Sequence, residues 1–206
     1  MLFRSLKAFL GKEYQSLLLV DLICHGVPSL SFLKQHIQTI IGNKKVKRVV
    51  FREDNECILS LIAPDQSILY RSDLWKNRFE DLYYNTFIDG FTTRSSCHTC
   101  PYATPKRISD ITIGDFWGID EDFRKEHNHG VSCIFPITLK GEQFIQHISN
   151  KLYLHEESIE KAINGNDQLR LPQKANLRIK IFLAIHKVLG IKLSYQLCVL
   201  DRIIKI

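Results

Sequence analysis

The sequence predicts an α/β fold: a mixed sheet with flanking helices, an antiparallel meander, a cysteine-containing loop and a C-terminal helical tail. Three observations predict this class. An apolar, strand-like run is followed by a loop and an amphipathic helix, which is the element order of α/β folds. Three short apolar runs separated by polar turns then indicate the meander. Apolar and basic residues at helical spacing end the chain and predict the tail.

The first 42 residues predict a helix, a strand and a second helix. Apolar residues recur at helical spacing over 2–10, and Gly11 suits the position after a helix end. The run SLLLVDLI (16–23) is expected to be a buried strand that ends just before Cys24. Ser29 is a typical helix-capping residue, and Gly42 a typical stop, for a helix with these inward-facing positions: Leu30, Leu33, Ile37, Ile40 and Ile41.

The rest of the chain predicts the meander, a loop, two more strands and the tail. Meander strands are expected over 46–51, 57–63 and 67–71, and Ser72 is expected to cap the helix that follows. A loop spans 90–107, strands occur within 108–119 and 131–139, and a helix lies around 144–148. The tail starts near Lys174 and is expected to break at Gly190. We expect one domain over residues 1–171 and a basic amphipathic helical tail over 172–206.

Composition limits the class of protein. The chain has 206 residues, 45% of them apolar, which is enough for a packed core. Arg4 and Lys7 interrupt the N-terminal apolar residues, so no secretory signal is expected. Apolar runs such as LLLV are too short to span a bilayer, so we expect no transmembrane segment. These features predict a cytoplasmic location, where thiols stay reduced and six cysteines indicate metal binding, redox chemistry or burial.

A CxxC pair is the clearest candidate for chemistry. Cys97 and Cys100 lie in a loop that ends in Pro101, and two thiolates at this spacing can grip one metal ion or one edge of a cluster. Cys24, in the loop after the first strand, is the best third ligand. Other interpretations remain open: a chance pair, a thioredoxin-like redox motif assisted by His98, or a Cys₃His zinc site completed by His25 or His98. Cysteines 57, 133 and 198 lie in apolar patterns and are expected to be structural.

The segment DITIGDFWGI suggests a second candidate site. Asp115 is expected at the end of a strand, where its carboxylate would emerge from the core. Trp117 offers a flat indole surface, and Gly114 and Gly118 permit close backbone approach. The structural alternative is that Phe116 and Trp117 close the core while Asp115 caps a turn.

The net charge of +6 suggests an anionic partner. In the tail, basic residues alternate with aliphatic ones. This pattern is typical of a helix docked on its own domain, but it also fits a helix that contacts a partner or a membrane surface. Nucleic acid is a less favoured partner, expected only if the cysteines hold zinc.

Three longer segments carry a family resemblance: LLLVDLICHGVPS, RSSCHTCPYATPKRISDITIGDFWGI and HGVSCIFPITLKGEQFI. Together they resemble the C-terminal domain of the coenzyme F-420 hydrogenase/dehydrogenase beta-subunit family. The resemblance covers about residues 6–171. It implies an iron–sulfur flavoprotein that passes electrons between a partner protein, a [4Fe–4S] cluster and FAD, with Cys24, Cys97 and Cys100 as cluster ligands.

The sequence also departs from the family pattern at its N-terminus. A Gly-Thr-Pro-Cys segment usually precedes the first helix, and this chain starts at Met1 without it. We therefore expect an N-terminally truncated member that lacks the fourth cysteine ligand and part of the flavin site, which makes FAD a lesser expectation than the cluster. The partner would be a redox protein or an upstream iron–sulfur or flavin half.

The first functional hypothesis is an electron-transfer oxidoreductase subunit that relays electrons through the cluster. The residues expected to line the neighbouring redox site are Asp115, Trp117 and Gly118, with Gly130 and Ser132 near them. No catalytic acid, base or nucleophile is nominated, and enzyme activity in this chain stays open. The alternatives are a non-enzymatic remnant or interaction subunit with an incomplete cofactor site, and a basic zinc-binding module.

Overall fold

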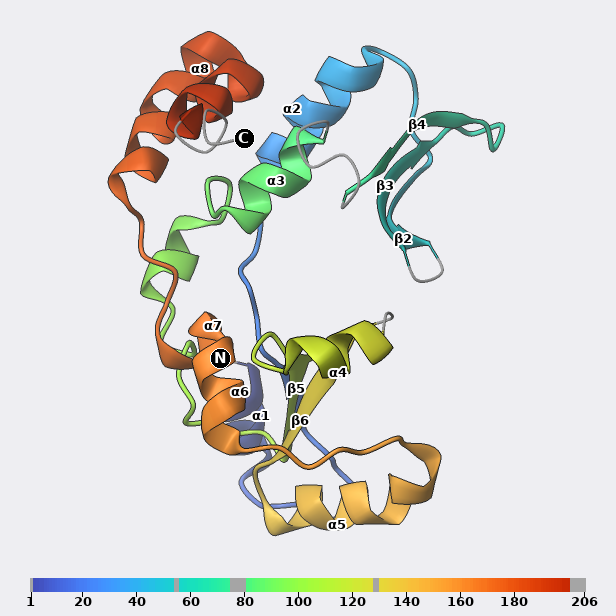
Figure 1. The fold of residues 1–206 in the computed structure, drawn as a ribbon, viewed down its shortest axis with the longest axis vertical. Coiled ribbons are helices and arrows are strands. Elements are labelled where there is room, and N and C mark those ends of the chain that lie inside the picture. The colour runs from blue at the N-terminus through green and yellow to red at the C-terminus, as the bar shows by residue number, and fades with distance from the viewer. Residues whose placement is uncertain (1, 54–55, 75–80, 128–129, 201–206) are drawn as a thin grey trace. The chain divides into compact units, whose positions relative to one another are not determined.

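The computed structural model describes residues 2–53, 56–74, 81–127 and 130–200 (Figure 1). The chain forms two compact units, each built from two stretches of sequence. Unit 1 comprises Met1–His25 and Thr99–Gln173, and unit 2 comprises Gly26–His98 and Lys174–Ile206. The sequence analysis expected a domain boundary at residue 171. Residues of the tail lie in unit 2 together with residues 26–98, and the expected division into a domain over 1–171 and a tail over 172–206 stays a prediction.

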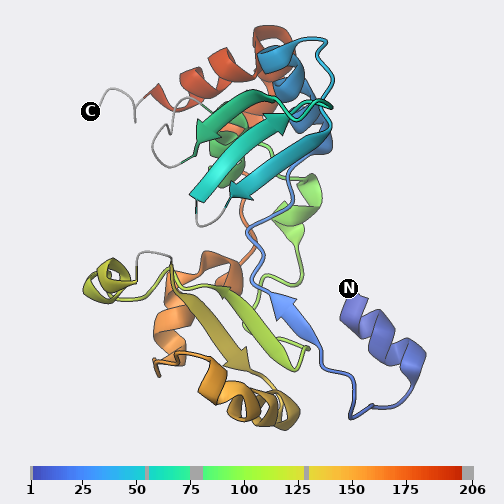
Figure 2. The ribbon, with the colours of Figure 1, turned by 90° about the vertical axis from the view of Figure 1, so that its right-hand side faces the viewer.

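A mixed three-stranded sheet lies in unit 1. Its strands are β1 (Val20–Leu22), β5 (Ile111–Asp115) and β6 (Ser132–Pro136), in the order β1-β5-β6. Strand β1 runs parallel to β5, and β6 runs antiparallel to β5, as Figure 2 shows. With the meander of unit 2, this sheet confirms the expected α/β class with one mixed sheet.

Strand β1 corrects one prediction. The sequence indicated a buried strand over 16–23, but only three residues pair, and Val20 and Leu22 are among the exposed apolar side chains. The reason is that β1 lies at an edge of the sheet and, among the described strands, pairs only with β5. Leu19, just before the strand, is the residue that enters the core.

Helices complete unit 1. They are α1 (Leu2–Leu10), α4 (Glu121–Glu126), α5 (Leu139–Ile148), α6 (Ile159–Gly165) and α7 (Asp167–Arg170), with a short 3₁₀ turn, η2 (Ser149–Lys151). The predicted bounds of helix α1, residues 2–10, are confirmed. The helix expected around 144–148 begins earlier, because Thr138 caps it by accepting a hydrogen bond from the Gly141 amide.

The predicted meander is confirmed in unit 2. Strands β2 (Arg48–Glu53), β3 (Glu56–Ile62) and β4 (Ile68–Asp73) pair in sequence order and antiparallel. Strand β3 is central, and its Leu59 and Leu61 side chains are fully buried. They pack with Ile41 and Leu74, so helix α2 covers one face of the meander.

The helices of unit 2 are α2 (Leu30–Ile41), α3 (Leu82–Ile88) and α8 (Leu177–Cys198), with a 3₁₀ turn, η1 (Ser95–Thr99). Two predictions about them are wrong. Ser72 lies in β4 and caps no helix, because the chain stays extended there; Asp81 caps α3 by accepting from the Tyr84 amide. In α2, Leu30 is exposed, whereas Phe32 and His36 are buried.

Helix α8 is part of the core of unit 2. Its Phe182 and Tyr195 side chains are buried against Phe32 of α2 and Phe91, which follows α3. The predicted break is confirmed, because Gly190 has non-helical torsions (φ 73°, ψ 168°). In the described part of the chain, α8 is the one helix long and apolar enough to cross a membrane by length and composition, which the sequence analysis did not expect.

Candidate functional site

Within unit 2, the loop after Cys24 pairs with the segment that leads to the CxxC motif. Pro28 and Thr93 form an antiparallel bridge, supported by a hydrogen bond of 2.9 Å from the Arg94 amide to the Val27 carbonyl. Gly26 makes this approach feasible. Its φ is +142°, and a Cβ atom there would lie 3.0 Å from the Thr93 methyl carbon.

The same pairing places a backbone amide within hydrogen-bonding distance of a cysteine sulfur. The Val27 amide donates a hydrogen bond of 3.3 Å to Cys97 Sγ, and Cys97 itself lies in the turn η1. Cys24 is only three residues before Val27, so the extended length of the chain keeps its Cα within about 11 Å of the Val27 Cα. Covalent connectivity and one hydrogen bond therefore tie the two predicted ligand loops together.

The cysteines have different surroundings. Cys24 is exposed, Cys97 and Cys100 are partly buried, and all six cysteines are free thiols. Across residues 2–53, 56–74, 81–127 and 130–200, no group of three or more His, Cys, Asp or Glu side chains is arranged to hold a metal ion. Cys24 and Cys100 belong to unit 1 and Cys97 to unit 2. The convergence of the three thiols on one metal centre thus stays a prediction.

The other cysteines differ in burial. Cys133 and Cys198 are buried, and burial raises the pKa of the Cys133 thiol to about 11. Cys133 donates to the Gly114 carbonyl, and Cys198 to the Arg178 carbonyl, which fits the structural role expected for them. Cys57 is only partly buried, on strand β3.

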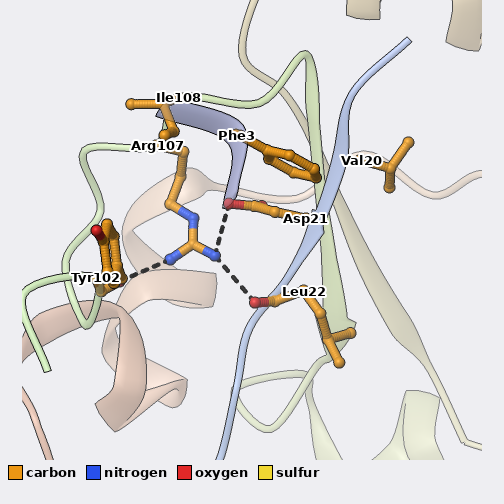
Figure 3. A pocket seen from close by; sticks show the side chains of 7 residues that line it. All are labelled: Phe3, Val20, Asp21, Leu22, Tyr102, Arg107 and Ile108. Carbon is orange, nitrogen blue, oxygen red and sulfur yellow. Dashed lines mark hydrogen bonds and ion pairs between the residues drawn. The ribbon is translucent and has the colours of Figure 1, made fainter. Parts of the chain in front are cut away.

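An arginine that the sequence analysis did not single out organises the end of β1 in unit 1. The Arg107 guanidinium lies 3.0 Å from an Asp21 carboxylate oxygen and donates to the Leu22 and Tyr102 carbonyls, both at 3.0 Å (Figure 3). The Arg107 side chain is 9% exposed and that of Asp21 is 20% exposed. Through this ion pair and these hydrogen bonds, Arg107 connects the segment after Cys100 to the strand that precedes Cys24.

These residues also line an open pocket of about 360 Å³. Its other walls come from Phe3, Val20, Tyr102 and Ile108. Among the described residues, two buried atoms of the ion pair, Asp21 Oδ1 and Arg107 Nε, have no hydrogen-bond partner. One signal was available in the sequence: Asp21 interrupts an apolar strand, and a carboxylate in that position needs a cation or a donor.

The strand after Asp110 packs against the residue before Cys24. A Cβ atom on Gly114 would lie 2.7–2.9 Å from three atoms of the Ile23 side chain, so only glycine fits there. The Ile23 amide also donates to the Ile113 carbonyl at 2.8 Å. Strand β5 thus fixes the position of the residue next to the predicted ligand Cys24.

A buried carboxylate supports β5 at its other end. Asp110 accepts hydrogen bonds of 2.8 Å from the Leu19 amide and from the Thr138 hydroxyl, and Lys140 lies 3.4 Å away. Burial by itself would raise the pKa of the Asp110 carboxyl, but these hydrogen bonds and the lysine charge outweigh burial and lower it. Asp110 is therefore an ionised structural anchor.

The five residues expected at a flavin or redox site all lie in unit 1, around one end of the β5–β6 pair. Asp115 is directly opposite Ser132 in the strand register, and both are exposed. Trp117 follows with an exposed indole, so it does not close the core. Gly130, before β6, has a φ of +91°.

Gly118 has a packing role. A Cβ atom there would lie 2.4 Å from the Lys161 carbonyl oxygen, because helix α6 rests directly on this residue. Phe116, by contrast, is buried with Ile119 and Cys133, as expected from the structural alternative. The assignment of the five residues to a cofactor stays a prediction.

Residues 3–162 match the family model that describes the C terminus of the beta subunit of coenzyme F420 hydrogenase/dehydrogenase. The match covers more than three quarters of the sequence, and it includes the three predicted ligand cysteines and Arg107.

The chain belongs to this family.

Membership in the F-420 beta-subunit family confirms the resemblance read from the sequence and indicates a redox subunit of that type. It also indicates partner proteins, since a beta subunit acts within a larger assembly. The match ends before α8, so the C-terminal helix lies outside the family domain. No curated protein sequence matches the chain.

Proposed function

We propose that this member of the F-420 beta-subunit family is an electron-transfer subunit that holds a [4Fe–4S] cluster bound by Cys24, Cys97 and Cys100. The observation that carries the proposal is the hydrogen bond from the Val27 amide to Cys97 Sγ. It joins the loop after Cys24 to the CxxC motif, and amide donors to ligand sulfurs are a means by which proteins set cluster potentials.

The donor set fits such a cluster. Thiolates are the usual ligands of a cubane, and these three cysteines are free thiols with at least partial solvent access. A bound cluster accepts and releases one electron at a time. The protein supplies placement: Gly26 permits the loop pairing, Gly114 seats Ile23, and Arg107 holds the segment after Cys100.

Three cysteines are one ligand fewer than the four that a cubane usually takes. In a bound cubane, the fourth iron would take its ligand from a group outside this triad. His25 is the neighbouring candidate, and its Nδ1 lies 3.3 Å from the Gln168 side-chain nitrogen. A His25→Ala variant that keeps its full iron content would remove His25 from the proposal.

FAD is the second cofactor to test. In the proposal its contacts come from the exposed Asp115, Trp117 and Ser132 around the end of the β5–β6 pair, with Gly118 and Gly130 beside them. The electron donor or acceptor is a separate redox protein, consistent with the beta-subunit type of the family.

The deciding experiment is anaerobic purification followed by iron, acid-labile sulfide, zinc and flavin assays. The proposal expects iron and sulfide in equal amounts, with a substantial loss of both in Cys24→Ser, Cys97→Ser and Cys100→Ser. Cys57→Ser is the matched control, because Cys57 is also a partly buried free thiol but lies in the meander, and it should keep the cluster.

Two outcomes would replace the proposal. Zinc without sulfide would favour the zinc-binding module. A folded protein that takes up neither iron nor zinc under anaerobic reconstitution would favour an interaction subunit with an incomplete cofactor site.

A further inference from the structure

Helix α8 has two apolar faces, and among the residues that the structure describes only one of them packs into the core. The inner face contributes buried side chains, among them Ile179, Phe182 and Tyr195. The outer face of the first half carries Leu177, Ile181, Ala184 and Val188, all exposed, with Val188 85% exposed. Their spacings of four, three and four residues place them in one stripe along the helix.

The second half of α8 shows the same division. Ile191, Tyr195 and Cys198 are buried, while Leu193 and Leu197 are exposed four residues apart. We call the exposed set of both halves the outer face of α8: Leu177, Ile181, Ala184, Val188, Leu193 and Leu197. Exposed apolar stripes on both halves of a helical segment are typical of a binding surface.

Three lysines lie beside the outer face. Lys180, Lys187 and Lys192 are all exposed, and each directly precedes an outer-face aliphatic residue. A position one residue earlier lies about 100° around a helix, so these lysines edge the apolar stripe. Their long aliphatic stems can lie along apolar surface while the ammonium groups stay in the polar layer.

The charge of the chain is concentrated in the same segment. Residues 174–206 contain seven Lys or Arg and one Asp, a net charge of +6 that equals the net charge of the whole chain. Residues 1–173 are therefore neutral overall. An anionic surface would be attracted to the tail and hardly to the rest of the protein.

Helix α8 fits a surface position better than a spanning one. At about 1.5 Å per residue its 22 residues would reach across a bilayer, but Gly190 interrupts the helical backbone and leaves two shorter pieces. The inner face is also committed to protein, because Phe182 is fully buried among aromatic rings. Spanning a membrane would require that core to open.

We propose that the outer face of α8 docks on an anionic phospholipid bilayer, with the helix lying in the plane of the interface. An apolar stripe edged by lysines, on a segment with almost no acidic residues, matches a surface of acyl chains covered by anionic headgroups. The inference is independent of the proposed cluster, since it rests on α8 alone.

Co-sedimentation of the full chain with vesicles tests the proposal. The protein should bind vesicles of 30% phosphatidylglycerol in phosphatidylcholine, bind pure phosphatidylcholine at least tenfold less, and be released by 0.5 M NaCl. Replacing Lys180, Lys187 and Lys192 together by Gln should lower the partition coefficient roughly a hundredfold, because each basic residue near an anionic surface contributes about one kcal/mol.

A double variant tests the apolar part. Ile181→Gln with Val188→Gln should lower binding at least tenfold while far-UV circular dichroism and the melting temperature stay unchanged, since both side chains point outward. The matched control is Leu139→Gln with Phe144→Gln on α5, which changes two exposed apolar residues of unit 1 and should bind like the wild type.

Three results would overturn the inference. The first is no binding to anionic vesicles, or equal binding to neutral ones. The second is resistance to both salt and alkaline carbonate, which would indicate a spanning helix. The third is a concentration-dependent dimer, seen by light scattering, that the Ile181/Val188 variant abolishes, because a second copy would then cover the outer face.

Discussion

Replacing Arg107 by Met should loosen the end of β1, because the change removes the cation from a mostly buried ion pair and leaves Asp21 uncompensated. Breaking a fully buried pair costs about 3–5 kcal/mol. Asp21 keeps 20% of its side-chain surface in solvent and Arg107 keeps 9%, so the cost should fall to about 2–3 kcal/mol. The lost hydrogen bonds to the Leu22 and Tyr102 carbonyls are included in this estimate.

Hydrogen exchange followed by mass spectrometry measures this change locally, which suits a chain with two units. At 1.4 kcal/mol per factor of ten, amides in the peptide covering 19–24 should exchange about 30- to 150-fold faster in the variant. The Ile23 amide is the most informative, since it donates to the Ile113 carbonyl. Cluster content should fall as well, because Arg107 holds the segment after Cys100.

Two further variants make the prediction specific. Arg71→Met is the matched control: Arg71 pairs with Glu53 and Glu56 on an exposed surface, so its loss should change exchange less than fivefold. Adding Asp21→Asn to Arg107→Met should recover part of the lost protection, because the buried charge is gone. An Arg107→Met protein whose 19–24 peptide exchanges within threefold of the wild type would refute the anchoring role of the guanidinium.

Three other predictions follow from single contacts. Gly114→Ala should lower the free energy of unfolding by about 1–3 kcal/mol, measured in urea, because the new methyl would overlap Ile23; an unchanged stability would contradict the contact. Asp110→Asn should destabilise the protein most at neutral pH. The pKa of Asp110 is lowered in the fold, so its ionised form stabilises the protein fully at pH values above the ordinary pKa of 3.8. The difference in free energy of unfolding between wild type and variant should therefore shrink as the pH falls through the folded-state pKa. A difference that stays constant from pH 7 to pH 3 would contradict this prediction. Iodoacetamide at pH 8 should alkylate the exposed Cys24 of metal-free folded protein and spare Cys133, whose pKa is about 11, as peptide mass spectrometry would show.

Local sequence patterns were sufficient for helices α1 and α2, for the helical tail and for the meander, whereas α4, α6 and α7 were not predicted. Helices α1 and α2 begin and end where spacing and glycines predicted, and the Gly190 break is present. These features depend on residues within about ten positions of one another, so interactions within short segments are enough to determine them. The family motifs were also readable, since they are contiguous.

Predictions failed where a distant partner determined the outcome. The run 16–23 is apolar enough for a buried strand, yet β1 is a short strand at the edge of the described sheet, where β5 is its one neighbour. Ser72 looked like a helix cap, but pairing with Leu59 keeps it in β4. Periodicity reports which face of an element is apolar and says nothing about its place in a sheet.

The sequence by itself determined the fold class, the family and the identity of the candidate ligands Cys24, Cys97 and Cys100. Only the tertiary structure revealed that the Val27 amide reaches Cys97 across 70 residues and that Arg107 reaches the Leu22 carbonyl across 85. Only it showed that one apolar face of α8 remains outside the core. The physical reason is that such contacts depend on strand order and helix packing, which bring distant segments together through the combined burial of many side chains.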